Sequence, residues 1–214
     1  MTVKNFVDDL EGLRRGLHLG KINLLGHSWG GLLAMDYVIK YPAKVGKIIL
    51  VSSIGAASDW VAPFVHNRES RRTFQDSVAL AKLTGSEAFG KRAPPVMEQF
   101  ARLFFKSYFY TQSLADSLTI TFTPETAKNF LSIFGLMSRE ITHYDIRSKL
   151  HELTCPVLIL HGEDDPVPLE TAKEVQSSIP GSKLVVLGKC GHFPFIESPK
   201  DFFDYCEKFL GNDR

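Results

Sequence analysis

Residues 21–31 read KINLLGHSWGG, a short apolar run that leads directly into a glycine-rich turn. The run is typical of a buried strand, and residues 32–39, LLAMDYVI, have the pattern of a helix. The G-x-S-x-G pattern at 26–30 therefore lies between a predicted strand and a predicted helix, where this motif forms a sharp turn. The turn would expose the Ser28 hydroxyl, and the N–H groups at the helix start would point to the same place. We interpret Ser28 as a candidate nucleophile.

The segments around this turn alternate between strand and helix patterns. Apolar residues recur at helical spacing over residues 3–17, and residues 47–51, KIILV, favour a strand. The same alternation resumes after residue 145, with predicted strands at 156–161 and 183–187 and predicted helices at 170–177 and 199–210. This alternation predicts a parallel α/β sheet flanked by helices.

Residues 55–145 interrupt the alternation. This stretch is rich in Phe and Tyr, is mostly helical in its apolar period and contains no strand-like run. We interpret it as a helical cap inserted after the second strand. Residues 1–54 and 146–214 would together form the α/β core.

Two loops after predicted strands carry an acid and a base that could activate a serine. Residues 161–168 read HGEDDPVP, and residues 191–199 read GHFPFIESP. Both follow the carboxyl end of a strand, where α/β sheets hold their ligands. A serine hydroxyl is a weak nucleophile, so an acid and a histidine are expected to follow it in that order.

With GHSWGG, these two blocks make the chain similar to the α/β-hydrolase family, from the helix before the nucleophile strand to the C-terminus. The resemblance implies that Ser28 is the nucleophile, His192 the general base and Asp165, not Asp164, the acid that orients the imidazole. It implies the backbone N–H of Trp29 as an oxyanion donor, and no metal or cofactor. Glu197 is interpreted as a structural residue.

Of two substrate classes, small peptides with a free N-terminus are the leading expectation. The cap and the GHSWGG block are similar to those of proline iminopeptidases, which implies an acyl-enzyme mechanism on small peptides with a free N-terminus. Such a substrate needs a carboxylate for its ammonium group, and the candidates in the cap are Glu98, Glu125 and Glu140. The alternative is hydrolysis of an ester, a thioester or a carbon–carbon bond. A cap carboxylate facing Ser28 would favour the peptidase, and an apolar cap the alternative.

Composition excludes several other classes of protein. The 25 Lys and Arg residues nearly balance 24 Asp and Glu, so the sequence predicts neither nucleic-acid nor membrane partners, only a small molecule or short peptide. The three cysteines lack metal-ligand spacing, which favours reduced thiols and a cytoplasmic location. The first residues do not resemble a secretory signal.

The resemblance covers only the C-terminal part of the family's sheet. No H-G-G-type motif precedes Ser28, so the source of a second oxyanion donor stays open, and an inactive truncated member is a further alternative. Residues 21–25 would lie at an exposed sheet edge and contain no charge, proline or bulge to protect it. We therefore expect self-association through this edge and low activity.

Overall fold

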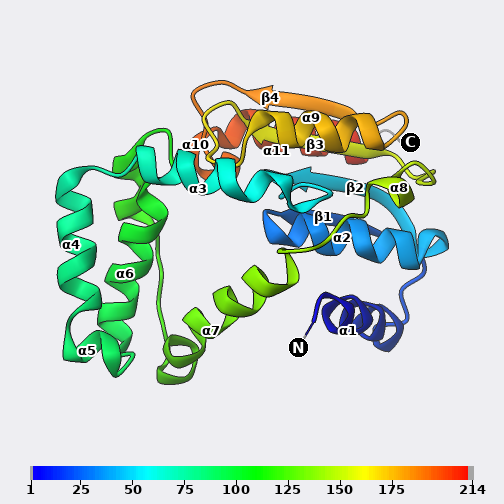
Figure 1. Cartoon of the computed structure of the whole chain (residues 1–214). Helices are drawn as coiled ribbons and strands as arrows, with labels where there is room; N and C mark the ends of the chain where they lie inside the picture. The colour runs from blue at the N-terminus through cyan, green and yellow to red at the C-terminus, as the bar shows by residue number, and fades with distance from the viewer. Residues whose placement is uncertain (1, 212–214) are drawn as a thin grey trace.

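Four parallel strands form the sheet in residues 2–211, the part of the chain that the computed structural model describes. Their spatial order, β1-β2-β3-β4, is also their order in the sequence (Figure 1). Leu25 of β1 pairs with Ile49 of β2, and Leu50 of β2 pairs with Ile159 of β3. The strands are β1 (Ile22–His27), β2 (Val45–Val51), β3 (Val157–Gly162) and β4 (Lys183–Leu187).

Helices cover both faces of this sheet. Because successive strand residues point to opposite faces, Ile48 and Leu50 pack in one apolar cluster and Ile49 and Val51 in another. The larger cluster includes residues of α1 (Val3–Gly16), α2 (Trp29–Lys40), α8 (Arg147–Leu150) and α9 (Leu169–Ser178), together with Trp60. The smaller contains residues of α10 (Pro194–Glu197) and α11 (Pro199–Leu210). The predicted α/β architecture is thus confirmed.

Strand β1 lies at the edge of the sheet among the described residues. Its side chains are only partly covered, and Leu25 is 54% exposed. The pairing with β2 is irregular between Ile22 and Leu24, where the extra residue lies in β2 and not in the edge strand β1. There the Asn23 side-chain oxygen accepts the Lys47 N–H at 2.9 Å in place of a backbone carbonyl. This irregularity depends on a contact between two strands, so residue types alone do not predict it.

The segment between β2 and β3 is helical and extends from one side of the sheet (Figure 1). Thr73 and Thr123 each begin a helix by accepting a backbone N–H three residues later. No helix in residues 2–211 combines the length and the apolar character needed to cross a bilayer. The segment contains η2 (Ser58–Trp60), α3 (Val61–Ser70), α4 (Phe74–Thr84), α5 (Glu87–Gly90), α6 (Pro94–Lys106), η3 (Gln112–Ser117) and α7 (Pro124–Glu140). A further short 3-10 helix, η1 (Pro42–Lys44), precedes β2 in the core.

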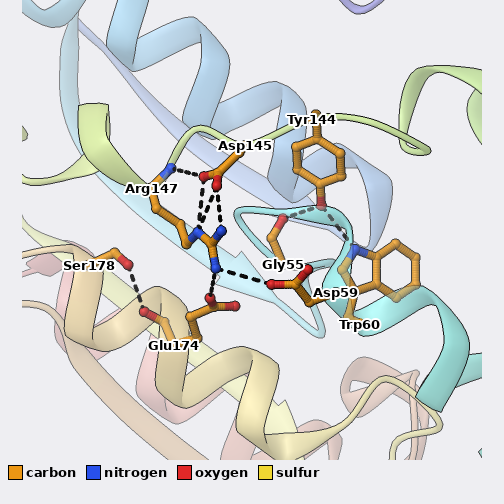
Figure 2. Close-up of polar contacts among 8 residues, drawn as sticks. All are labelled: Gly55, Asp59, Trp60, Tyr144, Asp145, Arg147, Glu174 and Ser178. Atoms are coloured by element: carbon orange, nitrogen blue, oxygen red, sulfur yellow. Dashed lines mark hydrogen bonds and ion pairs between the residues drawn. The ribbon is translucent and has the colours of Figure 1, made fainter.

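The two ends of this helical segment meet where it joins the sheet. Ala57 and Asp145 form an isolated antiparallel bridge. The Tyr144 hydroxyl donates to the Gly55 carbonyl and accepts the Trp60 indole N–H at 3.0 Å (Figure 2). The start and the end of the segment are therefore tied to each other.

Arg147 adds an ionic contact at the same place. Its guanidinium lies among the carboxylates of Asp59, Asp145 and Glu174 (Figure 2). The Asp59 contact is 3.1 Å and the Glu174 contact 2.8 Å. Because Glu174 belongs to α9 of the core, Arg147 connects both ends of the helical segment to a helix that packs on the sheet.

Candidate active site

Ser28 occupies a sharp turn between the end of β1 and the start of α2. Its backbone has φ 56° and ψ −121°, a left-handed conformation that costs a residue other than glycine roughly 1–3 kcal/mol. The Ser28 N–H donates to the Val51 carbonyl of β2 at 2.9 Å, and its own carbonyl accepts the Gly31 N–H at 3.0 Å. The neighbouring strand and the first helical turn therefore hold the serine in this conformation.

Close packing requires Gly26 of the motif and Gly31 just after it, while Ser28 itself adopts the strained backbone. A Cβ atom on Gly26 would lie 2.3 Å from the Gly30 carbonyl oxygen, and one on Gly31 would lie 2.0 Å from the Ser53 hydroxyl. A Cβ on Gly30 would meet nothing within 4 Å. Of these three glycines, therefore, only Gly26 and Gly31 lie where a side chain would clash.

His192 and Asp165 form a buried hydrogen-bonded pair. The His192 Nδ1 lies 2.9 Å and 3.0 Å from the two carboxylate oxygens of Asp165. Burial by itself raises the pKa of the Asp165 carboxyl, but the charge and hydrogen bond of His192 more than offset this and leave the pKa below its usual value. Asp165 is therefore ionised, and Nδ1 donates to it. This contact leaves Nε2 for another partner.

The loop that carries Asp165 is fixed by further hydrogen bonds. The Val167 N–H donates to Asp165 Oδ1 at 2.8 Å. The ring of His161, fully buried at the end of β3, contacts the Val167 carbonyl at 2.9 Å. Asp164 instead has a side chain that is 35% exposed, 4.0 Å from Arg71. The two neighbouring acids thus face different surroundings, and only Asp165 contacts the histidine.

His27 connects the serine turn to the histidine loop, a contact that sequence reasoning missed. Its Nε2 donates to the His192 carbonyl at 2.7 Å, and the two rings lie 4.8 Å apart. Burial, reinforced by the charge of His192, lowers the pKa of His27 to about 4, so this ring is neutral near pH 7. The only signal in the sequence was its position next to Ser28.

Glu197 holds the His192 loop against the helical segment. Its carboxylate accepts the Gly191 N–H at 2.9 Å, the Tyr110 N–H at 2.8 Å and the Thr111 N–H at 3.2 Å. The next residue along the loop, His192, donates its own N–H to the Tyr108 carbonyl at 2.8 Å. One carboxylate therefore connects two segments more than 80 residues apart in the sequence.

A cavity of about 590 Å³ lies between the sheet and the helical segment, and both Ser28 and His192 line it. Most of its wall is apolar or aromatic, and Trp29 also lines it. The charged residues among those described in the wall are Asp59 and Arg68, with His192 as a titratable third. The remaining lining includes Ile54, Trp60, Val61, Phe64, Val65, Phe104, Tyr108, Phe134, Met137, Ile141 and Val167.

None of the three glutamates expected to bind an ammonium group is among the described residues that line this cavity. Glu98 accepts the Phe122 N–H at 3.0 Å within the helical segment. Glu140 accepts the Val3 N–H at 2.8 Å, at the first turn of α1. Glu125 lies in the first turn of α7, where its charge suits the N-terminal end of the helix. Glu98 and Glu140 thus serve backbone contacts elsewhere.

Trp29 is the first residue of α2 and lies directly after Ser28. Its indole packs edge-on against Phe6 of α1, with ring centroids 5.1 Å apart. The backbone N–H at this position is one of the helix-start donors that have no partner within their own helix. Its role as an oxyanion donor stays a prediction.

Comparison with known proteins identifies relatives of this chain. Residues 1–199 match the family described as "alpha/beta hydrolase fold". The chain is 29% identical to a 2-hydroxy-6-oxo-2,4-heptadienoate hydrolase of Pseudomonas putida, over 97% of the chain and 70% of that protein. It is 28% identical to a proline iminopeptidase of Heyndrickxia coagulans, over 97% of the chain and 73% of that protein. A solved meta-cleavage product hydrolase from Pseudomonas fluorescens superposes with a TM-score of 0.72 at 20% identity, over 100% of the chain and 73% of that structure.

Proposed function

Because the chain belongs to the α/β-hydrolase fold family, we propose that it is a serine hydrolase with Ser28 as its nucleophile. The observation that carries this proposal is the buried His192–Asp165 pair, whose His192 lines the same cavity as Ser28. Asp165 holds Nδ1 of the imidazole, so Nε2 is the atom that can exchange a proton with the serine. The strained turn presents the hydroxyl at a helix start, where negative charge is stabilised.

The reaction proceeds through an acyl-enzyme. His192 Nε2 takes the Ser28 proton as the serine oxygen attacks the carbonyl carbon, and the Trp29 N–H stabilises the oxyanion. His192 then gives the proton to the leaving group. Water, activated by the same imidazole, hydrolyses the acyl-serine bond and restores the enzyme.

The cavity supports a small, mainly apolar substrate with an ester or a carbon–carbon bond beside a carbonyl. Aromatic and aliphatic side chains form most of its wall, and Glu98, Glu125 and Glu140 lie outside its described lining. The relative named for 2-hydroxy-6-oxo-2,4-heptadienoate hydrolysis is consistent with this class.

A prolyl aminopeptidase is the second candidate. Several relatives named proline iminopeptidase match at 25–29% identity. The carboxylate available for a substrate ammonium in the described wall is Asp59, which is already paired with Arg147. We rank this activity second because such a pairing weakens its attraction for an amine.

A fluorophosphonate probe tests the proposed nucleophile directly. We expect it to label the wild-type protein, and Ser28→Ala to abolish the label, because the probe reacts only with an activated serine hydroxyl. EDTA should leave labelling unchanged. Labelling of Ser28→Ala at the wild-type rate would contradict the proposal. A comparison of the turnover of p-nitrophenyl butyrate with that of proline β-naphthylamide then decides between the two substrate classes.

A further inference from the structure

Arg68 lies in the cavity wall in a setting that suits substrate recognition. It belongs to α3 and is the only Lys or Arg among the described residues that line the cavity. Its guanidinium lies over two aromatic rings, 5.6 Å from the centroid of Phe64 and 5.3 Å from that of Phe104. The side chain is 19% exposed. Aromatic contacts on a partly buried guanidinium hold its plane in a fixed orientation.

Arg68 also lies close to the reacting groups. Burial raises the pKa of the Tyr108 hydroxyl to about 12, and the nearby Arg68 guanidinium opposes this effect. The Tyr108 ring in turn packs against the His192 ring, with centroids 5.2 Å apart. One side chain therefore separates Arg68 from the proposed general base, within reach of a substrate bound at Ser28.

The charges around Arg68 leave this end of the cavity positive. Arg68 contacts Glu69 through Nε at 3.2 Å and Nη2 at 2.7 Å, and Nη1 takes part in neither contact. Arg72 contacts the same carboxylate. Two guanidinium groups thus share one carboxylate whose side chain is 44% exposed, and its charge is partly screened by water.

Asp59, the negatively charged residue in the described cavity wall, is expected to bind a charged substrate group more weakly than Arg68. The Asp59 side chain is 71% exposed, and Arg147 lies against it (Figure 2). Electrostatic attraction is strongest where water is excluded, so the 19% exposed Arg68 attracts a charged ligand more strongly than Asp59. The cavity therefore favours an anion over an amine.

From this arrangement we infer that Arg68 binds a carboxylate group of the substrate, so that the cavity takes acyl compounds with an apolar body and an anionic end. The inference rests on the proposed function only in assuming that the cavity is the substrate site. The planar guanidinium presents paired N–H donors that match the two oxygens of a carboxylate. Arg68 is thus a specificity-determining residue and takes no part in proton transfer.

Intrinsic fluorescence gives a test that does not depend on turnover, because both tryptophans of the chain, Trp29 and Trp60, line the cavity. The probes are 4-phenylbutyrate, its neutral amide 4-phenylbutyramide, and 4-phenylbutylamine. They share a phenylalkyl body and differ in the terminal group, which is negative, neutral or positive. We expect the carboxylate to bind about tenfold or more tightly than the amide, as one charge-assisted contact implies. Arg68→Met should remove this difference while the amide binds as before, and Arg68→Lys should keep part of it.

Arg92→Met is a matched control, since the Arg92 guanidinium also lies over a phenylalanine, 4.9 Å from the Phe89 centroid, but outside the described cavity wall. This variant should keep the full preference for the carboxylate. Equal binding of carboxylate and amide, or tightest binding of the amine, would overturn the inference. Fluorophosphonate labelling of Ser28 in Arg92→Met should also stay at the wild-type rate, because Arg92 lies outside the described cavity wall. If the probe does not label the wild-type protein, the proposed function is contradicted, whereas the binding test of Arg68 is unaffected.

Discussion

At the scale of single residues, the site depends on which of two adjacent acids contacts the histidine. Asp165 is buried and accepts from His192, whereas Asp164 is 35% exposed and lies beside Arg71. Both acids occupy one turn after β3, and the fixed loop geometry directs one side chain inward and the other outward. The resemblance to the family implied Asp165, and the hydrogen bond is the physical reason to keep that assignment.

Substitution of each acid by its amide tests the assignment. In Asp165→Asn the amide no longer holds the imidazole as the tautomer with a free Nε2, so we expect the rate of fluorophosphonate labelling to fall on the order of 10⁴-fold. Asp164→Asn is the matched control, and it should label at nearly the wild-type rate because an exposed ion pair contributes little. The reverse order of these two rates would assign the acid to Asp164.

At the scale of elements, the catalytic loops are held by contacts between segments distant in the sequence. His27, at the end of β1, donates to the carbonyl of His192. Glu197, in α10, accepts N–H groups from the His192 loop and from residues 110–111 of the helical segment. These contacts make the position of His192 depend on both the end of β1 and the helical segment.

Glu197→Gln should therefore disturb His192 without removing any reacting group. An amide keeps one acceptor oxygen but places an NH₂ group against backbone N–H donors, which costs about 1–3 kcal/mol. We expect labelling of Ser28 to slow by roughly tenfold. The pH midpoint of the labelling rate should move as well, because the environment of the imidazole changes.

Asp201→Asn, on α11, serves as the control for this variant. Its carboxylate accepts only the exposed Ser198 hydroxyl at 3.0 Å in the described contacts, so the midpoint and the rate should not change. An unaltered pH midpoint in Glu197→Gln would show that Glu197 does not position His192.

At the scale of the whole molecule, the exposed edge of the sheet dominates the expected behaviour of the 214-residue chain. In the described residues β1 pairs on one side only, with β2. Unpaired N–H and C=O groups along an edge are a template for another strand. The irregularity at Asn23 affects the start of β1, whereas residues 24–27 keep regular pairing with β2.

We predict that the purified chain associates through this edge. Leu25→Lys should shift the protein toward the monomer in light scattering, because a charge on an edge strand opposes pairing with a second copy. Val78→Lys, at a 52% exposed position on α4 far from β1, should leave association unchanged (Figure 1). A wild-type chain that stays monomeric at all concentrations would contradict the prediction.

The sequence by itself determined the strand–helix alternation, the G-x-S-x-G turn and the order of the acid and histidine loops. These features depend on local chemistry: apolar periodicity, β-branched runs and the residues that end each strand. Parallel strands bring their carboxyl ends to one edge, so the order of elements predicted that the acid loop and the histidine loop lie close together. The choice of Asp165 came from the resemblance to the family, and its contact with His192 agrees with that choice.

Only the tertiary structure decided which side chains of the helical segment face the cavity. Glu98 and Glu140 had the right charge but contact backbone N–H groups elsewhere, while Arg68, which has no motif, lies in the wall. An apolar stripe along a helix shows that this face packs against another element. It specifies neither which element that is nor how the helix is rotated about its own axis. The contacts of His27 and Glu197 join residues 165 and 87 positions apart, and such pairings arise only when the packed elements meet.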